Sequence, residues 1–466
     1  MRIYKQAIYL LLYYILKSFH TFEKQNHNRN VLCNERYGGC TMFSNYQEVN
    51  TFLEGRKQLG VKPGLGRVRF LLERLGHPER TIQAIHVAGT NGKGSTVTYI
   101  KGMLMNGGWK VGTYTTPHIA GLKAEIEIDG SSMTDTQSVE LVNRMLPFIE
   151  MLDESGNPPT AFEIHTVAAF CFLGEHAEIS VIETGMGGTE DATNCFTPLL
   201  SIITNVGLDH QRMLGETIAA IAGHKAGIIK QRVPLVLGDV SGEAATVILN
   251  KAKEFHAPVY QISKDFSIKK VAAEHPDQTV FTFESNGWSQ EAVISMAGSH
   301  QVKNAALALM AVKLLKGRFP FEWPKALKGL QHAVTSGRFE KIHDHPAIIV
   351  DAAHNPEGMA AFLQTVNHFY PDKKKQLLFA AFKDKPLQKM LPQLEDEFQS
   401  VHFTTFLHER AASAEVLQSH YPAKNSKIVE WEKVIRRHLD SSGESILFIT
   451  GSLYFIELVR KFFVKP

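Results

Sequence analysis

Cysteine is scarce in this sequence, with only four among 466 residues: Cys33, Cys40, Cys171 and Cys195. Their spacing fits no metal-binding motif, so we expect reduced thiols in a cytoplasmic protein. An excess of one charge is also lacking, because 50 Lys and Arg residues accompany 47 Asp and Glu residues. The resulting net charge of +3 gives no reason to expect nucleic acid or a membrane surface as the main partner. A small molecule is the predicted partner.

A long apolar run is lacking as well. Residues 7–16 are apolar and follow Arg2 and Lys5, but about ten residues are too few to span a bilayer. No clear cleavage site follows them. The sequence from Met42 onward is typical of a domain start. We interpret residues 1–41 as an N-terminal extension outside the fold, with a membrane or export signal as the alternative.

The stretch 81–96 carries the clearest chemistry in the chain. Ile82, Ile85 and Val87 suit a buried strand, residues 97–104 suit a helix, and a glycine-rich turn lies between them. Glycines let backbone amides approach a phosphate, a helix start adds about half a positive charge, and Lys93 adds a full one. The alternative is an ordinary strand–turn–helix with a surface lysine. The predicted phosphate cradle consists of Gly89, Thr90, Asn91, Gly92, Lys93, Gly94, Ser95 and Thr96.

The remaining chain alternates strands and helices. Apolar strands at 179–183 and 200–205 each end in a polar loop, which is typical of a parallel sheet with its site at the carboxyl ends of the strands. Residues 265–297 alternate like antiparallel strands. The expected helices include 46–59, 68–75, 161–173, 218–229, 304–315 and 358–369. The predicted fold class is α/β, with a P-loop mononucleotide-binding domain containing a mostly parallel sheet at 42–336 and a smaller Rossmann-like α/β domain at 337–466.

Nine short stretches resemble, in order, motifs of one known family. They are Gly-Thr-Asn-Gly-Lys at 89–93, Thr-Ala-Phe-Glu at 160–163, Gly-Met-Gly-Gly at 185–188 with Asp-Ala-Thr-Asn at 191–194, Asn-Val-Gly-Leu-Asp-His at 205–210, Lys-Ala-Gly-Ile-Ile-Lys at 225–230, Gly-Ser-His-Gln-Val-Lys-Asn-Ala-Ala at 298–306, Gly-Arg-Phe-Glu at 337–340, Asp-Ala-Ala-His-Asn-Pro at 351–356 and Gly-Ser-Leu-Tyr at 451–454. Together they resemble the folylpolyglutamate synthases, often also dihydrofolate synthases, within the Mur ligase superfamily.

That resemblance implies an ATP- and Mg²⁺-dependent ligase that joins L-glutamate to a folate, and dihydropteroate is a further possible acceptor. It also implies an acyl-phosphate intermediate and a monomeric protein. The implied nucleotide contacts outside the cradle are Asn304, Arg338, Asp351 and His354. The implied magnesium ligands are Thr116, Glu163 and His210. Catalytic roles are implied for Lys93, His210 and Lys225, the last as a carbamate.

Four of the implied roles have a simpler structural alternative. Glu163 could only complement a helix dipole, and His210 could cap a loop. Lys225 could form an ion pair, and Asn304 could present a surface amide.

Two loops depart from the family pattern. The family usually has Asn-Glu-Arg where this chain has Lys123, Ala124 and Glu125, and Arg with an apolar residue where it has Thr189 and Glu190. These changes reverse or remove charge near the implied substrate region. Another Mur-type amino-acid ligase, or a catalytically weakened ATP-binding protein, therefore stays open as an alternative at this point.

Overall fold

The computed structural model describes residues 42–116, 121–421, 423, 425–441 and 443–464. The predicted extension at 1–41 lies outside the described residues, as do Pro117 and His118. Within them, no helix is long and apolar enough to cross a membrane.

An eight-stranded sheet forms the first unit, in the order β4-β3-β2-β5-β1-β6-β7-β8. The strands β2, β5, β1, β6, β7 and β8 run parallel, and β3 and β4 are antiparallel additions at one edge. Their bounds are β1 Ala84–Ala88, β2 Val111–Tyr114, β3 Ile126–Ile128, β4 Ser131–Ser132, β5 Ile179–Glu183, β6 Leu200–Ile203, β7 Leu235–Leu237 and β8 Val259–Gln261. The mostly parallel sheet predicted from the sequence is therefore confirmed.

Helices cover both faces of this sheet, because strands buried on both sides alternate their apolar side chains between two cores. Ile85 and Val87 of β1 pack in the core with α4 and α11, whereas Ala84 belongs to the core with α3, α6 and α7. The helices are α2 Tyr46–Arg56, α3 Gly66–Arg74, α4 Lys93–Asn106, α5 Leu122–Glu125, α6 Asp135–Glu154, α7 Ala161–His176, α8 Gln211–Leu214, α9 Ile218–Ala226, α10 Gly242–Glu254, α11 Ser299–Leu315 and α12 Trp323–Gln331.

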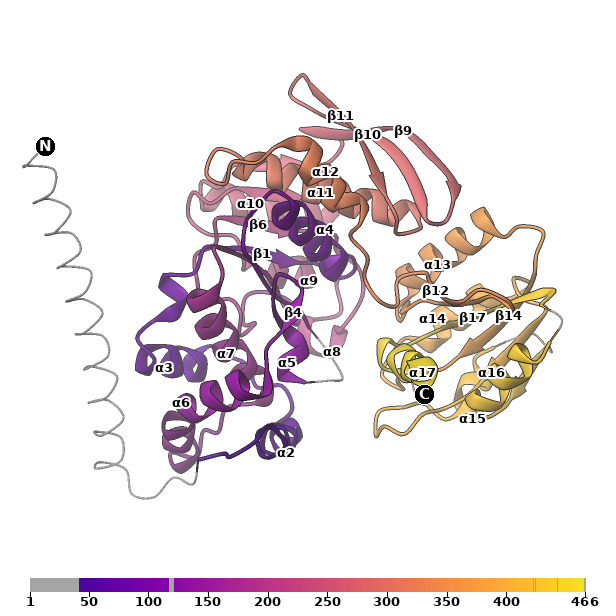
Figure 1. The fold of residues 1–466 in the computed structure, drawn as a ribbon, viewed down its shortest axis with the longest axis horizontal. Coiled ribbons are helices and arrows are strands. Elements are labelled where there is room, and N and C mark those ends of the chain that lie inside the picture. Colours follow the sequence, from indigo (N-terminus) through magenta and orange to yellow (C-terminus); the bar gives the residue numbers. More distant parts are fainter. Residues whose placement is uncertain (1–41, 117–120, 422, 424, 442, 465–466) are drawn as a thin grey trace, which may run out of the picture.

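A separate three-stranded antiparallel sheet packs against α11 (Figure 1). Its strands are β9 Phe266–His275, β10 Gln278–Ser285 and β11 Trp288–Ile294. The alternation at 265–297 predicted this sheet correctly, because one face is buried against the helix and the other is solvated.

The second unit contains a six-stranded sheet in the order β12-β13-β17-β14-β15-β16. All its pairs are parallel except β12 with β13. Its elements are β12 Glu340–His343, β13 Ile348–Val350, α13 Pro356–Phe369, β14 Lys374–Phe379, α14 Leu387–Met390, β15 Ser400–Phe403, α15 Ala414–Ser419, β16 Ser426–Ile428, α16 Trp431–Leu439, β17 Ser445–Thr450 and α17 Leu453–Val464. The predicted boundary at 336/337 falls between α12 and β12, and it stays a prediction.

Several element ends differ from the sequence predictions. The helix expected from 97 begins at Lys93, directly after Gly92, whose φ of 82° is left-handed. The helix expected from 304 begins at Ser299, after Gly298 with a φ of 109°. The helix expected to reach 229 ends at Ala226, which is followed by Gly227. In each case a glycine marks the end of the element.

Helices α4 and α12 approach each other closely at a pair of glycines. A Cβ atom added to Gly102 would lie 2.5 Å from the carbonyl oxygen of Gly329, and one added to Gly329 would lie 2.0 Å from that of Gly102. The two backbones are therefore in direct contact, which only glycine permits.

Candidate active site

The predicted cradle occupies the turn between β1 and α4. It rests on polar groups from neighbouring strands and helices: the hydroxyl of Thr204 donates to the carbonyl of Asn91 at 2.6 Å, and the amide N–H of Asn91 donates to Asn205 at 2.9 Å. A Cβ atom on Gly92 would lie 2.3 Å from Oδ1 of Asn304. These contacts fix the loop at the carboxyl end of β1, with the start of α4 directed at the position of an anion.

Lys93 folds back over the loop. Its Nζ donates to the carbonyl of Gly89 at 3.2 Å and lies 3.9 Å from a carboxylate oxygen of Glu183. Glu183, the last residue of β5, is buried, accepts a hydrogen bond from the backbone of Thr116 and lies within the field of Arg338. Burial raises the pKa of Glu183 to about 7 despite these partners. The structure thus brings Thr116, Lys93, Glu183 and Arg338 together.

Glu163 occupies a different place from the one predicted. Its carboxylate accepts hydrogen bonds from Nε of Arg67 at 2.9 and 3.1 Å and from the backbone N–H of Thr160 at 2.8 Å, in a capping box that begins α7. Both carboxylate oxygens have partners, and within the part of the chain that the structure describes no hydrogen bond or ion pair joins Glu163 to Lys93 or Thr116. The magnesium-ligand role predicted for Glu163 stays a prediction, and the carboxylate that the structure places beside the cradle is that of Glu183.

His210 begins α8 with a left-handed φ of 52°. Its Nε2 lies 3.9 Å from Oδ2 of Asp209, and 44% of its side chain is exposed. Desolvation lowers the pKa of His210 to about 4, although the charge of Asp209 opposes this. The imidazole is thus neutral near pH 7, the state in which it can accept a metal ion.

Asp209 joins the two units, and neither it nor Lys385 was singled out by the sequence. Its buried carboxylate lies 2.8 Å from Nζ of Lys385, 3.3 Å from Nδ2 of Asn355 and 3.6 Å from Nε2 of His354. Burial alone would raise the pKa of Asp209, but its contact with His354 and the charge of Lys385 hold it well below its usual range. Asp209 therefore stays charged. Only the docked second unit brings these partners together, so no local sequence signal could reveal them.

A second bridge runs from the cradle itself. The side-chain amides of Asn91 and Asn355 exchange two hydrogen bonds, at 2.9 and 3.2 Å. Asp351 is buried and accepts hydrogen bonds from the backbone N–H groups of Phe339 and Ala353 at 2.9 and 2.8 Å, and burial raises its pKa. The polar loop after β13 thus lies against the phosphate cradle.

Asn304 and Ser95 are connected through Gln301. The amide of Asn304 donates to Gln301 at 3.1 Å, and Gln301 donates to the hydroxyl of Ser95 at 3.3 Å. Asn304 is buried on α11, and its side chain packs against Gly92 of the cradle. It therefore does not present a surface amide.

Lys225 is buried on α9, with 2% of its surface exposed. No carboxylate of the described residues lies within 4.0 Å of its amine, so the ion-pair alternative finds no partner there. Burial, followed by the charge of Lys93, lowers the pKa of Lys225 to about 7. Part of this amine is therefore neutral and nucleophilic at neutral pH.

The two departing loops have internal partners. Lys123 pairs with Asp135, and the buried carboxylate of Glu125 lies 2.7 Å from Nδ1 of His165. The backbone N–H of Thr189 donates to the carbonyl of His224 at 2.8 Å. The charge changes in these loops are thus accommodated within the fold.

The fit to magnesium rests on the donor set. Among the described residues, no group of three or more His, Cys, Asp or Glu side chains is arranged so that it could hold a metal ion by itself. Mg²⁺, however, keeps several waters and takes only one or two carboxylates beside phosphate oxygens. One hydroxyl, one buried carboxylate and one neutral imidazole around the cradle fit that requirement.

Comparisons with known proteins show the family of this chain. Residues 87–312 match the model of the Mur ligase middle domain, and residues 337–453 match the Mur ligase, glutamate ligase domain. The chain is 40% identical over 428 residues to the dihydrofolate synthase/folylpolyglutamate synthase of Bacillus subtilis, covering 90% of this chain and 99% of the relative.

Solved structures give the same result. The folylpolyglutamate synthase of Thermotoga maritima is 31% identical, with a TM-score of 0.79 over 90% of this chain and 97% of that one. A solved FPGS–AMPPCP–folate complex is 29% identical, with a TM-score of 0.76 over 90% of this chain and 100% of that one.

Proposed function

The chain belongs to the dihydrofolate synthase/folylpolyglutamate synthase family and is an ATP-dependent amide ligase of that type; from this premise we propose how its own residues act and on which acceptors. The acceptor is a reduced folate, whose γ-carboxylate is joined to the α-amine of L-glutamate, and dihydropteroate is a second acceptor. The observation that carries the proposal is the convergence of Lys93, Glu183 and Thr116 on the phosphate cradle.

The reaction needs a leaving group that a carboxylate lacks. The acceptor carboxylate attacks the γ-phosphorus of ATP, so the acyl phosphate forms and ADP leaves. The amine of glutamate then attacks the acyl carbon, phosphate departs with the bonding electrons, and the ammonium proton is lost to solvent or a base. Lys93 and the amides at the start of α4 neutralise the phosphate charge during the first step.

Domain contacts complete the site. From the second unit, Asn355 binds Asn91 of the cradle, and His354 and Lys385 contact Asp209. These contacts position the two units around the acyl phosphate. Excluding water there protects the intermediate from hydrolysis. Asn304, Arg338, Asp351 and His354 remain our proposed nucleotide contacts.

We propose Thr116, Glu183 and His210 as the residues that hold Mg²⁺, with Glu183 in place of Glu163. When bound, the ion neutralises charge on the phosphates and orients them. The proposal is supported by the burial of Glu183 beside Lys93 and by the neutral state of His210.

Lys225 is proposed to carry a carbamate. Its neutral amine would attack carbon dioxide and lose a proton, which gives an anionic oxygen ligand. The absence of a described carboxylate near its Nζ supports this, because a carbamate would supply the missing negative charge beside Lys93. We also propose that the protein is a cytoplasmic monomer, and the free thiols of Cys171 and Cys195 support the location.

The test is ADP release by the full chain with MgATP and L-glutamate, comparing tetrahydrofolate, dihydropteroate and a muramyl peptide. We expect release that requires both glutamate and a folate or pteroate acceptor, and none from Lys93→Ala. Release with the muramyl peptide alone would replace the proposed acceptor. ATP binding without release for any acceptor would refute turnover at this site.

A further inference from the structure

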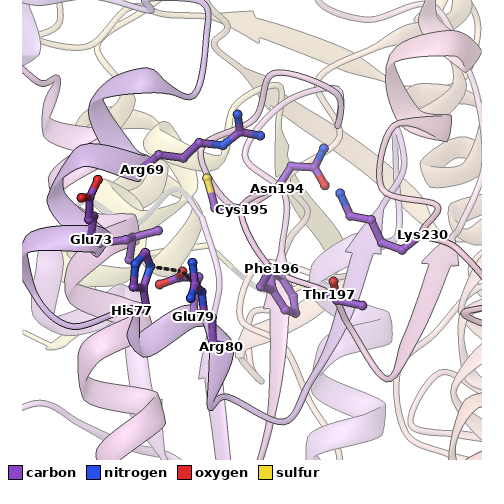
Figure 2. Close-up of a pocket in the computed structure, with 11 residues that line it drawn as sticks. Arg69, Glu73, His77, Glu79, Arg80, Asn194, Cys195, Phe196, Thr197 and Lys230 are labelled. Atoms are coloured by element: carbon purple, nitrogen blue, oxygen red, sulfur yellow. Dashed lines mark hydrogen bonds and ion pairs between the residues drawn. The ribbon is translucent and has the colours of Figure 1, made fainter.

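A pocket of about 580 Å³ lies away from the phosphate cradle. Its walls come from α3, from the η2 turn (Pro78–Arg80), from residues 194–197 and from Lys230 (Figure 2). The last three segments precede the parallel strands β1, β6 and β7. The cradle follows the carboxyl end of β1, so the pocket is at the opposite, amino edge of the same sheet. Its volume is within the range of small-molecule sites.

Two cations in this pocket have no counter-ion. Of the described carboxylates, none lies within 4.0 Å of the guanidinium of Arg69 or the amine of Lys230. Figure 2 shows both side chains directed from opposite walls toward the space beside Asn194 and Cys195. Burial lowers the pKa of Lys230, Cys195 opposes this shift, and repulsion between the two cations, Lys230 and Arg69, adds to it. An anion between them would relieve this repulsion.

The same pocket also has hydrogen-bond acceptors without partners. Asn194 is 7% exposed, and its Nδ2 donates to the carbonyls of Thr189 and Gly227 at 3.1 Å. These two bonds fix the orientation of the amide, and Oδ1 has no partner among the described residues. Oε2 of Glu79 is likewise buried and unpartnered, whereas its other oxygen binds His77 at 2.9 Å. A buried acceptor of this kind is destabilising unless a donor reaches it.

The charges of the lining limit the class of ligand. Three cations, Arg69, Arg80 and Lys230, face two carboxylates, Glu73 and Glu79, which leaves one positive charge when His77 is neutral. The complementary ligand has one net negative charge, acceptor groups for the cations and a donor group for the acceptors. An acidic amino acid has all three, because it carries two carboxylates and one ammonium. Inorganic phosphate and simple dicarboxylates lack the ammonium.

We propose that this pocket is a second, non-catalytic site that binds a free acidic amino acid. The carboxylates lie against Arg69 and Lys230, the ammonium faces Asn194 and the Glu79 side, and the methylene groups contact Phe196 and Leu72. The site stands on the pocket itself and does not depend on the ligase assignment. If L-glutamate is the co-substrate, as proposed above, the enzyme binds its own co-substrate at this second site as well.

The experiment is a saturation-transfer NMR titration of the full chain, without ATP or folate, using L-glutamate, L-aspartate and glutarate. Inorganic phosphate has no C–H proton to observe, so it is added as a competitor against the L-glutamate signal. We expect both amino acids to bind more tightly than glutarate or phosphate. Arg69→Gln and Lys230→Gln should each weaken binding by about tenfold or more, since each removes a charged partner. Lys93→Ala should leave it unchanged, which separates this site from the cradle.

Arg74→Gln is the matched control, because Arg74 lies on the same helix but its guanidinium stacks over Phe70, 5.1 Å from the ring centre. It should bind as the wild type does. The proposal would be overturned if Arg69→Gln and Lys230→Gln both bound the amino acids as tightly as the wild type. Loss of binding in Lys93→Ala would overturn it too. Tighter binding of phosphate would overturn the ligand class. If Arg69→Gln lowers the melting temperature strongly, Lys230→Gln alone decides.

Discussion

Replacing Lys385 by methionine should weaken the attachment of the second unit. Its Nζ lies 2.8 Å from Oδ1 of Asp209, and the two side chains are only 8% and 7% exposed. Removing one partner of a buried ion pair costs about 3–5 kcal/mol, because the other charge stays buried without compensation. Asp209 retains Asn355 at 3.3 Å and His354 at 3.6 Å. We therefore expect the lower end, about 3 kcal/mol.

The loss should be seen in two assays. In urea unfolding of the full chain it should destabilise the first transition, if the second unit detaches first. In the ADP-release assay it should lower kcat/KM by about a hundredfold, since 1.4 kcal/mol corresponds to a factor of ten. Lys389→Met is the matched control, because Lys389 is an exposed lysine that forms no ion pair with a carboxylate of the described residues.

A double-mutant cycle with Asp209→Asn isolates the pair. The combined variant should lose less than the sum of the two single variants, because neither charge is then left alone. Additive losses, or a Lys385→Met variant that unfolds and turns over like Lys389→Met, would refute the reasoning that this ion pair holds the units together.

Three further predictions concern the cradle and its supports. Glu183→Gln should raise the Mg²⁺ requirement and lower kcat by about a hundredfold or more. Glu163→Gln should instead lower the free energy of unfolding by about 1–3 kcal/mol and leave the magnesium titration unchanged. The opposite pattern would favour Glu163 as the ligand. Lys225 should show a carbamate signal in ¹³C NMR with labelled bicarbonate above pH 7, and the signal should fade below pH 7 as the amine is protonated; a signal that does not depend on pH would contradict the pKa of about 7. Since that pKa is below the ordinary 10.5, the unfolded state binds more protons between the two values, and the unmodified amine should make stability rise with pH across this window. Gly329→Ala should destabilise the fold by about 1–3 kcal/mol in urea because the new Cβ meets the Gly102 carbonyl, while Gly223→Ala on α9, where nothing lies within 4 Å, should be neutral or slightly stabilising; equal effects would refute the packing argument.

Local patterns were enough to predict the glycine-rich turn between β1 and α4 and the sheets. The Gly-Lys turn needs only adjacent residues, and the alternation at 265–297 follows from one buried face of β9 to β11. Helix α6 was missed, although a capping box of Thr134 and Gln137 begins it. That box is a readable signal of a helix start.

The choice between Glu163 and Glu183 shows what the sequence could and could not supply. Thr160 and Glu163 also form a Thr-x-x-Glu capping box, which already favours a structural role for Glu163. The position of Glu183 beside Lys93 depends on β5 pairing with β1, which joins residues 96 positions apart, such as Val87 and Glu183. The Asp209–Lys385 pair depends on docking two separate units, so only the folded chain reveals it.

The glycine contact between α4 and α12 has a mechanical meaning. Helix α4 starts at Lys93, and α12 ends at Gln331, a few residues before the chain enters the second unit. A junction made of backbone alone has no rotamers to absorb strain. The helix that follows the phosphate loop and the helix that precedes the second unit are therefore held together by the same close contact. A displacement of α12 would be passed directly to α4, the helix whose first residues position the nucleotide.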